Sequence, residues 1–185
     1  MKPIFDLFRD LCLLRTGPER MPTAGLFVLL VVLANLAVST LVAVTSPFGA
    51  AAMDAIAAPV IAAAVLATST WLLLMMRGRG ERFTATFTAL MGADLVITSL
   101  SWPLVLLMRP TPDPGGFQFV LTLLQFALLF WWIRISAFVF TRALEVGRAQ
   151  GIAIAVFVVL ATLIVTASLF PPADPGPGTT SAAPA

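Results

Sequence analysis

Five apolar stretches, each long enough to cross a lipid bilayer as a helix, restrict how this chain can fold more than any other feature. They run roughly over Thr23–Val44, Ala55–Met76, Phe83–Met108, Phe117–Phe140 and Gly151–Phe170. About 20 residues of helix span a hydrocarbon core of roughly 30 Å. A helix is required because unpaired backbone groups cannot be left in lipid. The sequence therefore predicts an all-α fold, a polytopic membrane helical bundle with about five transmembrane helices.

The composition agrees with a chain whose solvent is lipid. Hydrophobic residues make up 59% of it and charged residues only 11%, whereas a soluble domain carries roughly 25% charged residues. The net charge of +2 is too small to indicate nucleic-acid binding. We therefore expect the lipid bilayer, and not a nucleic acid, to be the main partner.

The basic residues predict how the bundle is oriented. Cytoplasmic loops of membrane proteins carry an excess of Lys and Arg. Nine of the 11 basic residues fall on one side of the predicted membrane, and only Arg109 falls on the other. The nine are Lys2, Arg9, Arg15, Arg20, Arg77, Arg79, Arg82, Arg142 and Arg148. The N-terminus is therefore predicted to be cytoplasmic and the C-terminus to lie outside.

The two ends of the chain differ from its centre, which predicts three parts. Residues 1–21 form a cytoplasmic segment in which Pro3–Leu14 has the spacing of a short amphipathic helix. That helix lies either at the membrane interface or packed beneath the bundle. Residues 22–170 form the five-helix transmembrane domain. Residues 171–185, rich in Pro, Gly, Ala, Ser and Thr, are predicted to be a disordered external tail.

Two charged residues fall inside the predicted spans, where burying a charge is costly. Asp94 lies about 17 Å into the third span, and Arg134 lies roughly 10 Å from the cytoplasmic end of the fourth. Because these spans are antiparallel neighbours, we expect Asp94 to face the interior and to pair with Arg134. The pair either fixes helix register, belongs to a proton or ion relay, or forms a binding site for a charged group. Alternatively, Arg134 extends to the cytoplasmic headgroups without contacting Asp94.

Asn35 in the first span and Gln125 in the fourth are the other deep polar candidates. Interhelical hydrogen bonding is the expected role of both amides. Small residues also recur at intervals of four, as Ala58 and Ala62 do in the second span. This spacing favours close helix packing inside the bundle, with a dimerisation surface or another protein partner as the alternative.

No arrangement in the sequence indicates catalysis. The chain has no His, the commonest general base and metal ligand. Its one cysteine, Cys12, forms neither a zinc nor a redox pattern. We therefore expect no enzyme activity, no catalytic or metal site and no cofactor.

Two stretches resemble the Yip family, five-span membrane proteins of the eukaryotic secretory pathway with uncharacterised bacterial relatives. The first is GRGERFTATFTALMGA (residues 78–93), which is similar to the short basic loop leading into that family's third span. The second is RALEVGRAQGIA (residues 142–153), similar to the turn between spans four and five. The resemblance implies a non-catalytic scaffold or accessory subunit in a membrane complex, here in a bacterial inner membrane.

A small permease or ion-coupled transporter that uses Asp94 is the alternative function. The surroundings of Asp94 separate the two. A transporter predicts that this carboxylate faces a wet cavity with Asn35 or Gln125 nearby. A scaffold predicts that it is dry and paired.

Overall fold

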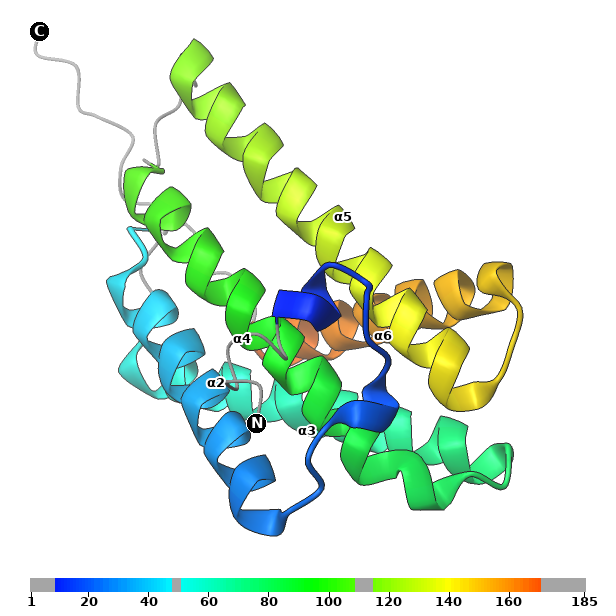
Figure 1. Cartoon of the computed structure of the whole chain (residues 1–185). Helices are drawn as coiled ribbons and strands as arrows, with labels where there is room; N and C mark the ends of the chain where they lie inside the picture. Colours follow the sequence, from blue (N-terminus) through cyan, green and yellow to red (C-terminus); the bar gives the residue numbers. More distant parts are fainter. Residues whose placement is uncertain (1–8, 48–50, 109–114, 171–185) are drawn as a thin grey trace, which may run out of the picture.

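The computed structural model describes residues 9–47, 51–108 and 115–170, and in these ranges it contains helices and no strand (Figure 1). The long helices are α2 (Gly25–Thr45), α3 (Ala52–Met76), α4 (Phe83–Leu107), α5 (Gly116–Leu144) and α6 (Arg148–Leu169). Two short 3₁₀ helices, η1 (Pro18–Arg20) and η2 (Gly80–Arg82), precede α2 and α4.

All five long helices are long and apolar enough to cross a membrane, which confirms the predicted all-α bundle and its five spans. Their ends fall within a few residues of the predicted ones, except where α5 continues to Leu144. Pro59 and Pro103 lie inside helices that continue beyond them, so neither proline ends its span. The predicted tail, residues 171–185, lies outside the described residues.

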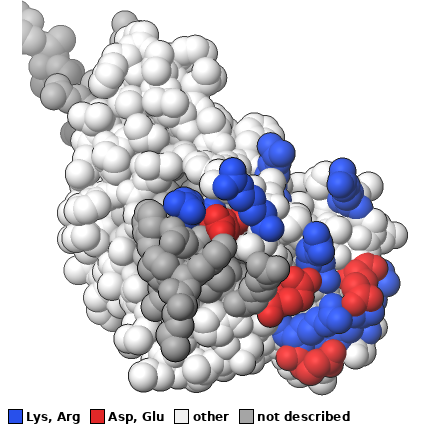
Figure 2. All heavy atoms as spheres, viewed as in Figure 1, with Lys and Arg blue, Asp and Glu red and all other residues white. Residues whose placement is uncertain are grey.

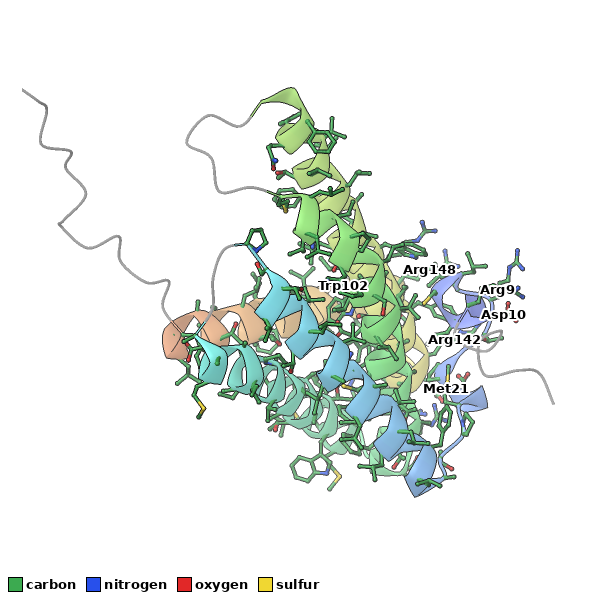
Figure 3. All side chains as sticks on the ribbon, turned by 90° about the vertical axis from the view of Figure 1, so that its left-hand side faces the viewer. Arg9, Asp10, Met21, Trp102, Arg142 and Arg148 are labelled. Atoms are coloured by element: carbon green, nitrogen blue, oxygen red, sulfur yellow. The ribbon has the colours of Figure 1, made fainter. Side chains whose placement is uncertain are left out.

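The most extensive contacts among the five long helices form a closed ring, in the order α2, α4, α5, α6, α3 and back to α2, and α3 also contacts α4 and α5. The helices do not run parallel. Figure 3 shows α4 and α5 rising while α3 and α6 run to the left, so the two pairs diverge from a common end. We call that end the arginine-rich end. It holds the start of α2 and the α3–α4 and α5–α6 connections.

Packing is dense toward the arginine-rich end and sparse toward the other. Most buried side chains of α4 and α5 lie in the halves of these helices nearest the arginine-rich end. They include Ala89, Leu90, Met91, Ala93, Ile135, Val139, Phe140 and Leu144. Charged side chains gather toward the same end on the face shown in Figure 2, whose upper left is uncharged. The bundle is thus closed at one end and splayed at the other.

An ion-pair network joins the two connections at the arginine-rich end. Glu145, which ends α5, accepts hydrogen bonds from both Nη atoms of Arg79 and lies 3.0 Å from Nη2 of Arg82. Nη1 of Arg82 also lies 3.5 Å from the carbonyl oxygens of Arg142 and Ala143, which are left unpaired where α5 ends. Hydrogen bonds from Arg79 hold the pKa of Glu145 below its usual 4.5. The network therefore fastens the α3–α4 connection to the end of α5.

Replacing Glu145 with Gln should lower the melting temperature in detergent at pH 7 by removing the charge that binds both arginines. Since the folded-state pKa is lowered, this stabilisation is fully present above the usual 4.5 and is lost as the pH falls through the lowered value. The melting difference between wild type and variant should therefore shrink in acid. Glu81→Gln is the matched control, because Glu81 is exposed and makes no ion pair within the described ranges. An equal effect of both substitutions would contradict the network.

The N-terminal segment, residues 9–21, packs against α4 and α5. Residues 9–12 form one helical turn, in which Leu11 is fully buried and Cys12 is 4% exposed. The indole N–H of Trp131 on α5 donates a hydrogen bond to the carbonyl oxygen of Cys12, at 3.1 Å. Of the predicted amphipathic helix, residues 3–8 lie outside the described residues. The described part is packed on the bundle, as in the second of the two placements expected from the sequence.

Candidate functional site

A cavity of about 580 Å³ opens between the diverging helix pairs, and all five long helices contribute to its walls. Asp94 and Trp132 line it at the level where dense packing begins. Thr98, Thr122 and Met108 line it farther from the arginine-rich end. The splayed helices therefore enclose a pocket that ends near the middle of the bundle.

Asp94 lies at the floor of this cavity and is bonded to Asn35. The Asn35 side-chain amide donates one hydrogen bond to Oδ2 of Asp94, at 2.8 Å, and another to the carbonyl oxygen of Met91, at 3.2 Å. Asn35 is the central residue of α2 and is 3% exposed. Its predicted interhelical hydrogen bonding is thus confirmed, and the partner is the intramembrane carboxylate itself.

Trp132 completes the surroundings of this carboxylate. Like Asp94, Trp132 lines the cavity at the level where dense packing begins. Its N–H is buried without a partner in normal hydrogen-bond geometry. The indole is therefore a neighbour of Asp94 whose N–H donor is unused.

The expected pair between Asp94 and Arg134 is not formed. Arg134 is exposed, and no ion pair joins it to an acid in the described part of the chain. Residues 132 and 134 point in directions about 200° apart on a helix, so when Trp132 faces the cavity, Arg134 faces outward. The last of the large exposed apolar side chains on α5 is Phe130. Arg134 follows one turn later, which agrees with a guanidinium that extends toward headgroups.

Gln125 also lines the cavity, but its expected interhelical hydrogen bond is not formed within the described residues. Its Oε1 atom is buried and has no hydrogen-bond partner. Two hydroxyls nearer the arginine-rich end share this condition, those of Thr70 and Ser136. Thr70 lies one turn beyond the lining residue Leu66, and Ser136 lies one turn beyond Trp132. Unpartnered polar atoms thus continue from the cavity floor into the packed half.

Small residues of α3 and α4 lie inside the bundle, among them Ala62 of the predicted packing face. Ala62 and Ala63 of α3 line the cavity, while Thr88 and Gly92 of α4 are buried in the packed half. Because the side chains of Ala62 and Ala63 are small, they leave space in the cavity that larger side chains on α3 would fill. A homo-oligomer or other protein partner that uses small-residue faces stays a prediction.

The chain matches no family model, no curated protein and no solved structure. The resemblance to the Yip family therefore stays a prediction. The two stretches that carry it meet at the arginine-rich end, where Arg79 and Arg82 of the first bind Glu145 of the second.

The cavity was not predicted from the sequence. Its width comes from the angle between helix pairs, and no residue pattern encodes that angle locally. One signal was available for the contact between Asp94 and Asn35. Both residues lie near the middle of helices that run in the same direction, so they share one depth.

Proposed function

We propose that this protein is a small carrier of the bacterial inner membrane that takes up a solute from the side opposite its arginine-rich end. Asp94 is the side chain that binds the solute or its coupling ion. The observation that supports this proposal is the cavity, which ends at the one carboxylate among its lining residues. With the arginine-rich end in the cytoplasm, the cavity faces outward.

A carrier also needs a second route, from the binding residue to the opposite side. The hydroxyls of Thr70 and Ser136 supply polar atoms in that direction, buried and without partners. Buried polar atoms are normally satisfied, so unsatisfied ones in line with a cavity support a path that opens in another state. Dense packing between Asp94 and the arginine-rich end would then be the closed gate of the present state.

This proposal takes the permease in preference to the scaffold or accessory subunit that the Yip resemblance implies. A scaffold gains nothing from a cavity of about 580 Å³ beside its central carboxylate. Asn35 does pair with Asp94, as a scaffold predicts, but the pair lines the cavity and is not sealed in a dry core.

Single cysteines test the two routes. In a Cys12→Ala background, which contains no other cysteine, Thr98→Cys should react with a charged, membrane-impermeant thiol reagent applied from outside. Thr70→Cys should react with the same reagent applied to inside-out vesicles, because its position becomes wet when the inner half opens. Reaction rates would be measured by mass shift of the whole protein.

The matched control is Ser99→Cys, on the residue next to Thr98. Ser99 is exposed on α4 but does not line the cavity, so lipid should cover it and block the reagent. A Thr98→Cys variant that reacts no faster than Ser99→Cys would overturn the outward cavity. A Thr70→Cys variant that is inert from the cytoplasmic side would overturn the carrier.

A further inference from the structure

Several polar atoms of the cavity lining can accept a hydrogen bond, beside an unpartnered donor, the indole N–H of Trp132. Both side-chain N–H groups of Asn35 are used, on Asp94 and on the carbonyl oxygen of Met91. The hydroxyls of Thr122 and Thr162 donate to the carbonyl oxygens one turn earlier on their own helices, at 3.0 and 2.9 Å. Their oxygens keep lone pairs that can accept.

Two further acceptors belong to residues that line the cavity, Gln125 and Asp94. Oε1 of Gln125 is buried without a partner. The Asp94 carboxylate has one hydrogen bond within accepted geometry, from Asn35, although it has about four lone-pair positions. A ligand that bonds to these acceptors must bring hydrogen-bond donors.

The charge of the cavity lining favours a cationic ligand. Its lining residues include one acid, Asp94, and no Lys or Arg. A carboxylate in an apolar enclosure is costly unless an opposite charge accompanies it. The aromatic faces of Trp132 and Phe126, which also line the cavity, attract cations as well. A cationic group beside Asp94 would satisfy both the carboxylate and the rings.

The rest of the lining determines the body of the ligand. Alanine, leucine, isoleucine, methionine and proline side chains make up most of the remaining wall. A small hydrated metal ion would leave this wall in contact with water. An apolar body attached to the charged group would cover it, which is favourable in proportion to the area removed from water.

From these observations we infer the ligand class, which rests on the proposed function: an amphiphilic organic ammonium ion, with its N–H groups on Asp94 and its apolar body between α3 and α5. The N–H donors separate this class from quaternary ammonium ions, which carry charge but cannot donate. The single charge separates it from polyamines, whose second ammonium would find no acid among the lining residues.

Three compounds that share one apolar cage test the inference: 1-adamantylammonium, 1-adamantanol and 1-adamantanecarboxylate. The full chain in lipid nanodiscs would be titrated by calorimetry, with empty nanodiscs as the partitioning blank. The ammonium ion should bind saturably and the carboxylate should not. Asp94→Asn should weaken ammonium binding at least about tenfold, because it removes one partner of a buried charge pair.

Two variants complete the experiment. Asp54→Asn makes the same chemical change in the first turn of α3, away from the cavity, and should bind like the wild type. Asp94→Glu keeps the charge and should bind more tightly than Asp94→Asn, so a loss in Asp94→Asn alone is not a folding defect. Equal binding by wild type and Asp94→Asn, or carboxylate binding as tight as ammonium binding, would overturn the ligand class.

The carrier and the ligand class can fail separately. A wild type that shows no saturable ammonium binding, while Thr98→Cys and Thr70→Cys react as expected, overturns the ligand class alone. Saturable, Asp94-dependent ammonium binding with an inert Thr70→Cys supports the ligand class and overturns the carrier.

Discussion

Placing an acid at position 11 should raise the alkylation rate of Cys12 by about 100-fold or more at pH 8, because thiolate is the reactive form. In the folded protein, burial raises the pKa of the Cys12 thiol to about 11, so very little thiolate is present. Leu11 is fully buried beneath the same helical turn. Leu11→Asp would put an unpaired charge there, which costs several kcal/mol, and the segment should detach from α4 and α5.

Cys12 is the one cysteine in the sequence, so a maleimide mass shift reports its reaction without further engineering. Leu13→Asp is the matched control, because Leu13 is 47% exposed and two residues away. That variant should react as slowly as the wild type. The wild-type rate should also keep rising with pH up to about 11, since burial and not a neighbouring charge suppresses the thiolate. If Leu11→Asp reacted as slowly as Leu13→Asp, burial of Leu11 would not be what holds residues 9–21 against α4 and α5.

The spans were predictable because the constraint on them is local. Each needs about 20 apolar residues to bridge the hydrocarbon core, and chain composition alone locates such stretches. The exception was the end of α5, which continues to Leu144 through Arg142. Arg142 lies over the ring of Phe138, and Glu145 binds Arg79 across the connection. The contact within α5 and the ion pair between the two connections hold helix where composition indicated a loop.

The candidate site was predictable in its residues but not in its pairing. Asp94 and Asn35 were identified as candidates because polar side chains are costly to bury in a membrane, and both lie at the cavity floor. The predicted pairing of Asp94 with Arg134 was wrong because depth and adjacency in the sequence do not give the direction in which a side chain points from its helix. The next span in the sequence, α5, contributes Trp132 to the cavity beside Asp94. The hydrogen-bond donor to Asp94 is Asn35, which lies on α2, two spans earlier in the sequence. How each helix is rotated about its own axis depends on the packing of all five long helices.

Replacing Gly151 with leucine should destabilise the bundle by about 3 kcal/mol, near the upper end for overpacking a filled site. Gly151 lies in the first turn of α6, where that helix approaches α5. A Cβ atom there would lie 2.8 Å from the carbonyl oxygen of Ala137 and would collide with the Thr141 hydroxyl. The hydroxyl can rotate away, but the carbonyl belongs to the backbone of α5. The two helices must therefore separate.

Helix propensity favours leucine over glycine at position 151, but this gain in stability is smaller than the loss from the collision with α5. Exchanging glycine for a better helix former gains roughly 0.5–1 kcal/mol, so a net loss of stability is expected. Ala153→Leu, two residues along α6 at an exposed position, adds a side chain without this contact and should melt near the wild type. Thermal unfolding in detergent compares the three proteins. If Gly151→Leu melted with Ala153→Leu, the close approach of α5 and α6 would not be what closes the arginine-rich end.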